Sequence, residues 1–380
     1  MNFTLAMPRK IVFGQGEFAR LPGMVAQLGS SALIVCGASQ RRRADELAVA
    51  LQATGVCTAV YGEVTGEPSP EQVQAAAATA RHTRCNVVVG LGGGSAMDAA
   101  KAAAAMATNE GSVTDYLENV GIGARLLHMP LPFVAVPTTA GTGAEATKNA
   151  VLCDVRKGYK SSLRDDRMMA AVAVVDPELC VGAPPAVTAA SGVDALTQLI
   201  EAYLCKRAHP LTDALALQAI PGVASSLPKV YADGEDLAAR EQMSYGGLLS
   251  GICLANAGLG AVHGIAAPLG ALLGVPHGLA CAVLLRPVLA VNLPQVGQKA
   301  RVLCRALTGR EEQLTHGCVH LIDEWMAELM EKLSIPPRLN HGGVTPELLD
   351  ALQRGISTSM GGNPVTLTGE QIRTLIAGVL

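Results

Sequence analysis

This sequence is poor in aromatic residues and in charge. Phe, Trp and Tyr make up 3% of the 380 residues, and charged residues make up 16%, with a net charge of -3. So few rings leave little surface for stacking nucleic-acid bases, and there is no long run of one sign to meet a phosphate backbone or an anionic lipid surface. We therefore expect neither nucleic acid nor a membrane as a partner.

The ten cysteines contain no CxxC pair and lie mostly among apolar residues. That distribution is typical of a reduced protein and not of a disulfide framework. The first residues, MNFTLAMPRK, also lack the basic and apolar regions of a signal peptide. We predict a cytoplasmic protein.

The fold class follows from a change of pattern along the chain. Short apolar runs at 10–13, 32–36, 57–61, 86–90, 133–136 and 171–175 alternate with helical stretches at 17–28, 42–53 and 71–82. This rhythm predicts a parallel, Rossmann-like sheet. After residue 187 strand signals nearly vanish and long helical periodicity takes over. We predict an α/β dinucleotide-binding domain over 1–182 and an all-α metal-binding and substrate domain over 183–380.

The longest uncharged stretch, residues 242–285, contains His263 and His277. Prolines and glycines interrupt it, so we interpret it as buried helices broken by loops and not as a membrane span. A buried imidazole needs a partner, and upstream Asp194 is a second polar group among apolar residues. One carboxylate and two imidazoles form part of the ligand set of a catalytic divalent metal. Each of them alone could instead cap a helix or satisfy a buried carbonyl.

A second motif follows the strand predicted at 86–90. It reads GLGGGS over 90–95 and runs into an alanine-rich helical stretch that ends at Ala107. The glycines permit a tight turn and a close ligand, and Ser95 stands where a helix N-cap is expected. A strand, a glycine turn and a helix N-terminus can bind a pyrophosphate, although such glycines can also serve backbone geometry alone.

Several longer motifs, taken with these two, resemble the iron-containing (group III) alcohol dehydrogenase family. They are GLGGGSAMDAAK (90–101), PTTAGTGAEAT (137–147), VVDPEL (174–179), GVDALTQLIEAY (192–203), NAGLGAVHG (256–264), PHG (276–278) and SMGGNPVTLT (359–368). The resemblance implies a dehydroquinate synthase-like architecture. It also implies metal-dependent hydride transfer between NAD(P)(H) and a small alcohol or aldehyde, by a homodimer or larger homo-oligomer.

For the metal, Fe²⁺ or Zn²⁺, the resemblance implies Asp194, His263 and His277 as ligands. The family's remaining ligand is a histidine one helical turn after the aspartate, and here that position is Gln198. Gln198 shares a helix face with Asp194. Gln198 could bind the metal through its amide oxygen, which is a weaker ligand than imidazole. It could instead hold a water, or contact the ligands without binding the metal itself.

For the cofactor, the resemblance assigns three groups of residues. The pyrophosphate turn takes Gly93, Gly94, Ser95 and Asp98; the nicotinamide side takes Thr138, Thr139 and Thr142; further contacts fall to Asn149 and Lys160. Glu67 replaces an asparagine that often contacts the cofactor.

The nucleotide preference rests on Gly37. In many members of the family, the strand that corresponds to 32–36 ends in an aspartate that binds the ribose 2′-hydroxyl. In this chain Gly37 follows the strand, with Ser39 and then three arginines. Loss of the acid removes repulsion of a 2′-phosphate, and a hydroxyl or guanidinium can bind one. We predict that NADP(H) is accepted as well as NAD(H). The arginines could equally form a solvated helix start.

Two other functions stay open. A lyase resembling dehydroquinate synthase needs a basic cluster for an acidic sugar phosphate, and the helical half shows none. A nucleotide-binding relative with an impaired metal site is suggested by Gln198 and by Ala267, which replaces a histidine often found there in the family. We interpret Glu145 and Glu201 as structural carboxylates.

Overall fold

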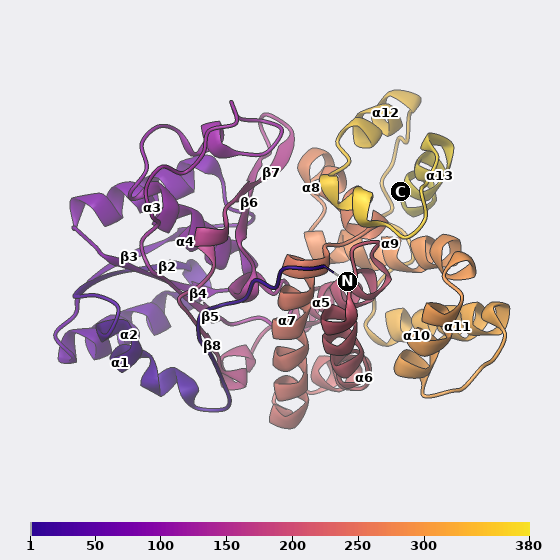
Figure 1. The fold of residues 1–380 in the computed structure, drawn as a ribbon, viewed down its shortest axis with the longest axis horizontal. Coiled ribbons are helices and arrows are strands. Elements are labelled where there is room, and N and C mark those ends of the chain that lie inside the picture. Colours follow the sequence, from indigo (N-terminus) through magenta and orange to yellow (C-terminus); the bar gives the residue numbers. More distant parts are fainter. Residues whose placement is uncertain (1) are drawn as a thin grey trace. The chain divides into compact units, whose positions relative to one another are not determined.

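The computed structural model describes residues 2–380, and the chain divides into two compact units (Figure 1). The first unit is Leu5–Val181, and the second is Gly182–Leu380 together with residues 2–4. Phe3 stacks on His209 of the second unit, with ring centroids 4.2 Å apart. Each unit is described by itself.

The first unit is built on a six-stranded sheet in which every pairing is parallel, with the order β1-β8-β5-β4-β2-β3. Its strands are β1 (Ile11–Phe13), β2 (Ser31–Gly37), β3 (Cys57–Val64), β4 (Val87–Gly92), β5 (Phe133–Pro137) and β8 (Val172–Val175). The central strands are apolar throughout because a parallel sheet is buried on both faces. The predicted α/β fold is confirmed.

Helices cover both faces of this sheet. Along β2, Leu33 and Val35 pack into a core with α3 (Pro70–His82) and α4 (Gly94–Met106). The alternate residues Ala32, Ile34 and Cys36 point the other way, into a second core with α1 (Leu21–Ala26) and α2 (Arg41–Ala53). The alternation follows from the two-residue period of a strand.

Two features of this unit were not expected from the sequence. A separate antiparallel hairpin joins β6 (Asn149–Asp154) to β7 (Tyr159–Arg164). The expectation that Ser95 caps α4 is wrong: the helix begins at Gly94, and its N-cap is Gly93, with no side chain bound there. The turn tightens one residue earlier because Gly92 adopts φ 149°, a conformation that favours glycine.

The second unit is helical, and the predicted all-α architecture is confirmed. Its helices are α5 (Pro185–Leu204), α6 (Pro210–Ala232), α7 (Leu237–Ala257), α8 (Ala261–Leu273), α9 (His277–Asn292), α10 (Gln298–Thr308), α11 (Thr315–Lys332), α12 (Pro346–Arg354) and α13 (Gly369–Val379). Small residues let these helices approach closely. A Cβ on Gly278 would lie 2.4 Å from the carbonyl oxygen of Ala190, so glycine is required where α9 begins against α5.

The uncharged stretch 242–285 forms much of α7, all of α8 and the first half of α9. By length and composition, one helical segment of the described residues, His277–Gln295, could cross a membrane, and 56% of its most apolar window is buried within the protein. Core helices of this kind pass the same test, and α7 and α8 are bent by 102° relative to each other.

Candidate metal centre and nucleotide turn

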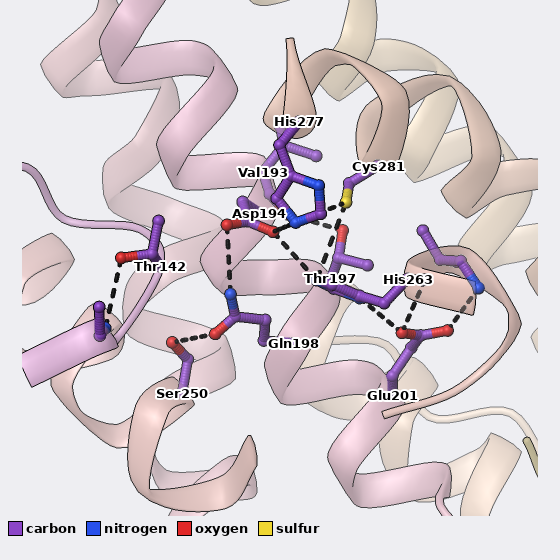
Figure 2. Close-up of polar contacts among 12 residues, drawn as sticks. Thr142, Val193, Asp194, Thr197, Gln198, Glu201, Ser250, His263, His277 and Cys281 are labelled. Carbon is purple, nitrogen blue, oxygen red and sulfur yellow. Dashed lines mark hydrogen bonds and ion pairs between the residues drawn. The ribbon is translucent and has the colours of Figure 1, made fainter. Parts of the chain in front are cut away.

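Four buried or half-buried side chains converge inside the helical unit (Figure 2). Asp194 lies in the middle of α5, His263 in the first turn of α8, His277 at the start of α9, and Cys281 one turn later on α9. One ligand atom from each lies within 4.8 Å of the others. The sequence singled out the first three of these residues, and the structure brings them together.

His263 is held in one orientation by two carboxylates. Its Nδ1 lies 2.7 Å from Oε2 of Glu201, and its Nε2 lies 3.1 Å from Oδ1 of Asp194. Glu201 also accepts the backbone N–H of Val262 at 2.7 Å, which locks the carboxylate at the start of α8. A hydrogen bond from Nδ1 to a carboxylate leaves Nε2 directed into the cluster, as it is in many metal-bound histidines.

The electrostatics of the cluster follow from this contact. Burial lowers the pKa of His263, but the neighbouring Cys281, Asp194 and Glu201 outweigh it, so that the pKa lies well above its usual 6.5. Burial also raises the pKa of the Cys281 thiol to about 11. Asp194 has a lowered pKa because its bond to His263 and the charge of His277 exceed the effect of burial.

Cys281 is a cluster member that the sequence analysis missed. Its Sγ lies 3.8 Å from Nε2 of His263 and 3.8 Å from Nε2 of His277. The available signal was its position four residues after His277, which places both on one face of α9. Nothing in its surroundings marked it, because cysteine is common in apolar helices.

Gln198 lies beside the cluster but turns its oxygen away (Figure 2). Its Nε2 donates to Oδ2 of Asp194 at 3.1 Å, and the hydroxyl of Ser250 donates to its Oε1 at 2.9 Å. An ionised carboxylate only accepts hydrogen bonds, so the amide nitrogen must face it. Gln198 thus binds one oxygen of Asp194, while the other oxygen faces the two histidines.

The donor set fits a divalent transition metal. Carboxylate oxygen, imidazole nitrogen and thiolate sulfur are the ligands of Zn²⁺ and related ions. The His277 Nε2 lies 3.8 Å from Oδ1 of Asp194, and the two rings face each other with centroids 5.4 Å apart. Because these atoms lie on three packed helices, a small ion between them could contact all of them.

The glycine turn (Gly92, Gly93 and Gly94) and the threonine loop (residues 138–147) lie together in the α/β unit. Thr138 follows β5, and its N–H donates to the carbonyl of Gly92 at 2.9 Å. A Cβ on Gly93 would lie 3.2 Å from Oγ1 of Thr139, and one on Gly94 would lie 2.6 Å from Cγ2 of Thr142. Glycine is needed here for the packing of the loop, whatever binds the turn. Ser95 occupies the first turn of α4.

Asp98 and Lys101 tie α4 to the following loop and hairpin. Oδ2 of Asp98 accepts the N–H of Val151 at 3.0 Å. Lys101, which was not singled out from the sequence, is 1% exposed. Its Nζ donates to the carbonyls of Ala144 (2.8 Å) and Asn149 (2.7 Å) and to the hydroxyl of Thr147 (3.0 Å), and it lies 3.4 Å from Asp98.

The remaining predicted cofactor residues lie on neighbouring elements. Lys160, on β7, pairs with Glu67 at 2.6 Å and is only 10% exposed, which accounts for the glutamate at position 67 as a counter-charge. Gly37 ends β2, and Ser39 is exposed in the turn that follows it. Since β2 pairs with β4 in parallel, Gly37 and the glycine turn lie at the carboxyl ends of neighbouring strands.

The first arginine after Ser39, Arg41, packs beside β3. A Cβ on Gly62 of β3 would lie 3.1 Å from Cδ of Arg41. Arg41 pairs with Asp45 at 3.0 Å, whereas Arg42 is 91% exposed. The run is therefore partly a solvated helix start and partly packed near the end of β2.

The buried acids Glu145 and Glu201 differ. Glu145 lies in the threonine loop, where burial raises its pKa to about 7. Glu201 is a direct partner of His263. The interpretation of Glu201 as a merely structural carboxylate missed this contact, which joins residues 62 positions apart.

Comparison with known proteins covers the whole chain. Residues 8–177 match the profile described as iron-containing alcohol dehydrogenase, and residues 188–380 match its C-terminal profile. A choline dehydrogenase of Bacillus subtilis (strain 168) is 35% identical, over 92% of this chain and 88% of the relative. The crystal structure of a 1,3-propanediol oxidoreductase aligns with a TM-score of 0.92 at 31% identity, covering all of both chains.

A further neighbour is the sulfoacetaldehyde reductase of Bifidobacterium kashiwanohense in complex with NAD⁺. It is 28% identical with a TM-score of 0.89, covering 100% of this chain and 99% of the neighbour. Both halves of the chain thus match one family. The chain belongs to the iron-containing alcohol dehydrogenase family and is a metal-dependent enzyme that transfers hydride between a nicotinamide nucleotide and a small alcohol or aldehyde.

Proposed function

We propose that this enzyme works as an aldehyde reductase or alcohol dehydrogenase whose divalent metal is held by Asp194, His263 and His277. The observation that carries the proposal is the convergence of their ligand atoms within 4.8 Å in the helical unit. A divalent metal bound there supplies Lewis-acid polarisation of the substrate oxygen, and the nicotinamide supplies or accepts the hydride.

The surrounding residues position the ligands. Glu201 holds Nδ1 of His263 at 2.7 Å and so directs Nε2 toward Asp194. Gln198 holds Oδ2 of Asp194 and leaves Oδ1 facing the histidines. We propose that Gln198 acts through this hydrogen bond and not as a ligand.

We further propose that the nucleotide binds at the carboxyl ends of the parallel strands, against Gly37, the glycine turn and the threonine loop. The support is that cofactor-binding residues assigned by the family motifs gather at the carboxyl ends of β2, β4 and β5, where nucleotides bind in doubly wound sheets. The N-terminus of α4, with no side-chain cap, is suited to the pyrophosphate.

For the nucleotide, we propose that NADP(H) is used, and that the cellular direction is reduction. Gly37 offers no carboxylate to bind a 2′-hydroxyl or repel a 2′-phosphate, and Arg41 packs against β3 near the end of β2. We expect Gly37→Asp to lower the NADPH-to-NADH ratio of kcat/KM by about tenfold or more. Arg42→Ala, on the solvated side of α2, is the matched control. An unchanged ratio in Gly37→Asp would reject this preference.

The metal proposal is tested by the metal content of anaerobically purified protein. We expect about one divalent ion per chain, lost in His263→Ala and retained in His320→Ala, which changes an exposed histidine of α11. NADPH binding should survive in both variants. Wild-type protein that takes up no metal even after reconstitution would favour the impaired, nucleotide-binding relative.

We also propose a cytoplasmic homo-oligomer, dimeric or larger, that needs neither nucleic acid nor a membrane. The ten cysteines all lie in the described residues and none forms a disulfide bond, as expected in a reducing compartment. Light scattering of the purified enzyme measures the oligomeric state, and a monomer at working concentration would contradict it.

A further inference from the structure

We propose that Cys281 is a metal ligand of this enzyme and takes the place left by Gln198, and that the thiolate makes Zn²⁺ the resident ion in preference to Fe²⁺. The inference rests on the proposed metal site at Asp194, His263 and His277. It concerns which atom completes that site, and so which ion the site retains.

The distances suit coordination by sulfur. Zn–N and Zn–O bonds of about 2.0–2.1 Å and a Zn–S bond of about 2.3 Å, at tetrahedral angles, separate N from S by about 3.6 Å and N from O by about 3.3 Å. Sγ of Cys281 lies 3.8 Å from each imidazole Nε2, and Oδ1 of Asp194 lies 3.1 and 3.8 Å from the same two atoms. These four separations differ from the tetrahedral values by about half an ångström or less.

The position of Cys281 is built into the fold. It lies four residues after His277 on α9, so both side chains project from one helix face. The close approach of Gly278 to the carbonyl of Ala190 keeps this end of α9 against α5, which carries Asp194. Cys281 is fully buried, so no solvent competes for the sulfur.

Other buried cysteines of this unit make a different kind of contact. Sγ of Cys205 donates to the carbonyl of Ala257 at 3.0 Å, and Sγ of Cys253 donates to that of Thr212 at 3.6 Å. Cys281 instead faces the ring nitrogens of His263 and His277. Two thiols thus satisfy backbone acceptors, whereas the third lies among metal-binding atoms.

The side-chain amide of Gln198 is oriented so that its oxygen does not face the metal site. Its amide nitrogen, which cannot bind a metal, faces Asp194, and its oxygen accepts from Ser250. Among the side chains whose ligand atoms converge here, Cys281 is the fourth donor beside Asp194, His263 and His277. Thiolate is a soft ligand that favours Zn²⁺, and replacing an imidazole by it lowers the relative affinity for Fe²⁺.

The direct test is zinc K-edge X-ray absorption on the wild-type enzyme reconstituted with Zn²⁺. We expect one sulfur scatterer at about 2.3 Å beside nitrogen and oxygen at about 2.0–2.1 Å. A shell of nitrogen and oxygen alone, with zinc bound, would overturn the role of Cys281 and leave the proposed function intact. A protein that binds Fe²⁺ but no zinc would overturn this inference alone, and a protein that binds neither ion would overturn both.

Cobalt substitution adds matched variants. Wild-type protein loaded with Co²⁺ should show a near-ultraviolet thiolate-to-cobalt charge-transfer band, which Cys281→Ser loses and Cys304→Ser keeps. Cys304 is the control because it is equally buried, and its Sγ contacts Thr308 within α10. A band that persists in Cys281→Ser contradicts the proposal.

The exchange of ligands can also be reversed. We expect Cys281→Ala to weaken Zn²⁺ binding by about 100-fold or more, at or beyond the upper end of what the loss of an outer partner costs. Adding Gln198→His should restore binding without the charge-transfer band and should lower the preference for Zn²⁺ over Fe²⁺ in competition. Unchanged zinc affinity in Cys281→Ala would count against coordination by sulfur, and the double variant shows whether a loss is specific or due to misfolding.

Discussion

The two units each bury a cluster of charged groups, and the clusters differ in where their polar atoms point. In the α/β unit, Lys101 donates to two carbonyls and a hydroxyl and lies near Asp98, so its ammonium group is satisfied by the protein. In the helical unit, the ligand atoms of Asp194, His263, His277 and Cys281 face one another.

This difference separates a structural network from a binding site. Burial is equally deep in both: Lys101 is 1% exposed and Asp194 2%. A buried cation with every donor used rigidifies the loop that it holds. The ligand atoms of the other cluster instead converge on one point from three helices, which is the arrangement that binds a metal ion. What distinguishes the functional site is that its metal-ligating atoms converge on one point, and not that it is buried.

The largest expected effect breaks the Lys101 network. Lys101→Met removes the cation and leaves Asp98 and two carbonyls without their partner, which should cost about 3–5 kcal/mol of unfolding free energy. Urea denaturation followed by circular dichroism measures it. Lys148→Met, which breaks an ion pair with the exposed Asp166, should cost about 1 kcal/mol or less. Equal losses in the two variants would show that the network is not special, and metal content should be unchanged in both.

A smaller effect concerns Glu145, a buried acid in the threonine loop that Lys101 holds. Its folded-state pKa of about 7 lies above the ordinary 4.5, so the folded state holds the proton more tightly than the unfolded state. Stability from this group is therefore present below pH 4.5 and is lost as pH rises through about 7, by about 3 kcal/mol in total. Glu145→Gln should flatten the dependence of Tm on pH between those values. The exposed Glu178→Gln should leave it as in the wild type, and a wild-type slope in Glu145→Gln would contradict the assignment.

The smallest expected effect tests the contact between Glu201 and His263 at the metal site. Glu201→Gln keeps a hydrogen-bond acceptor for Nδ1 of His263 but removes its charge. We expect metal affinity to fall 10- to 100-fold, or about 1.4–2.8 kcal/mol, with little change in folding. Competition with a chelator measures the affinity, and Glu324→Gln on α11 is an exposed control. A loss of stability with unchanged metal affinity would make Glu201 structural, like Lys101.

Much of the fold could be predicted because its signals are local. The six parallel strands lie within a few residues of the apolar runs that indicated them, since a strand buried on both faces is apolar at every position. The hairpin of β6 and β7 was missed because its residues alternate weakly and one strand reads YKSSLR. It is held by pairing across the hairpin and by Asp98, which binds its backbone at Val151.

The candidate site was only partly visible for the same reason. Asp194, His263 and His277 stand out because polar residues are rare in apolar stretches. Cys281 and Glu201 do not, because a cysteine in an apolar helix and a glutamate in any helix are ordinary. Their contacts with His263 join residues 18 and 62 positions apart in the sequence.

By itself, the sequence determined the elements, the fold class and the family, because hydrophobic period, glycine turns and long motifs are properties of neighbouring residues. Only the tertiary structure decided which polar side chains meet. The crossing of α5, α8 and α9 sets Cys281 among the histidines, turns the oxygen of Gln198 toward Ser250, and makes Glu201 a partner of His263. Such contacts depend on how helices pack, which no local pattern encodes.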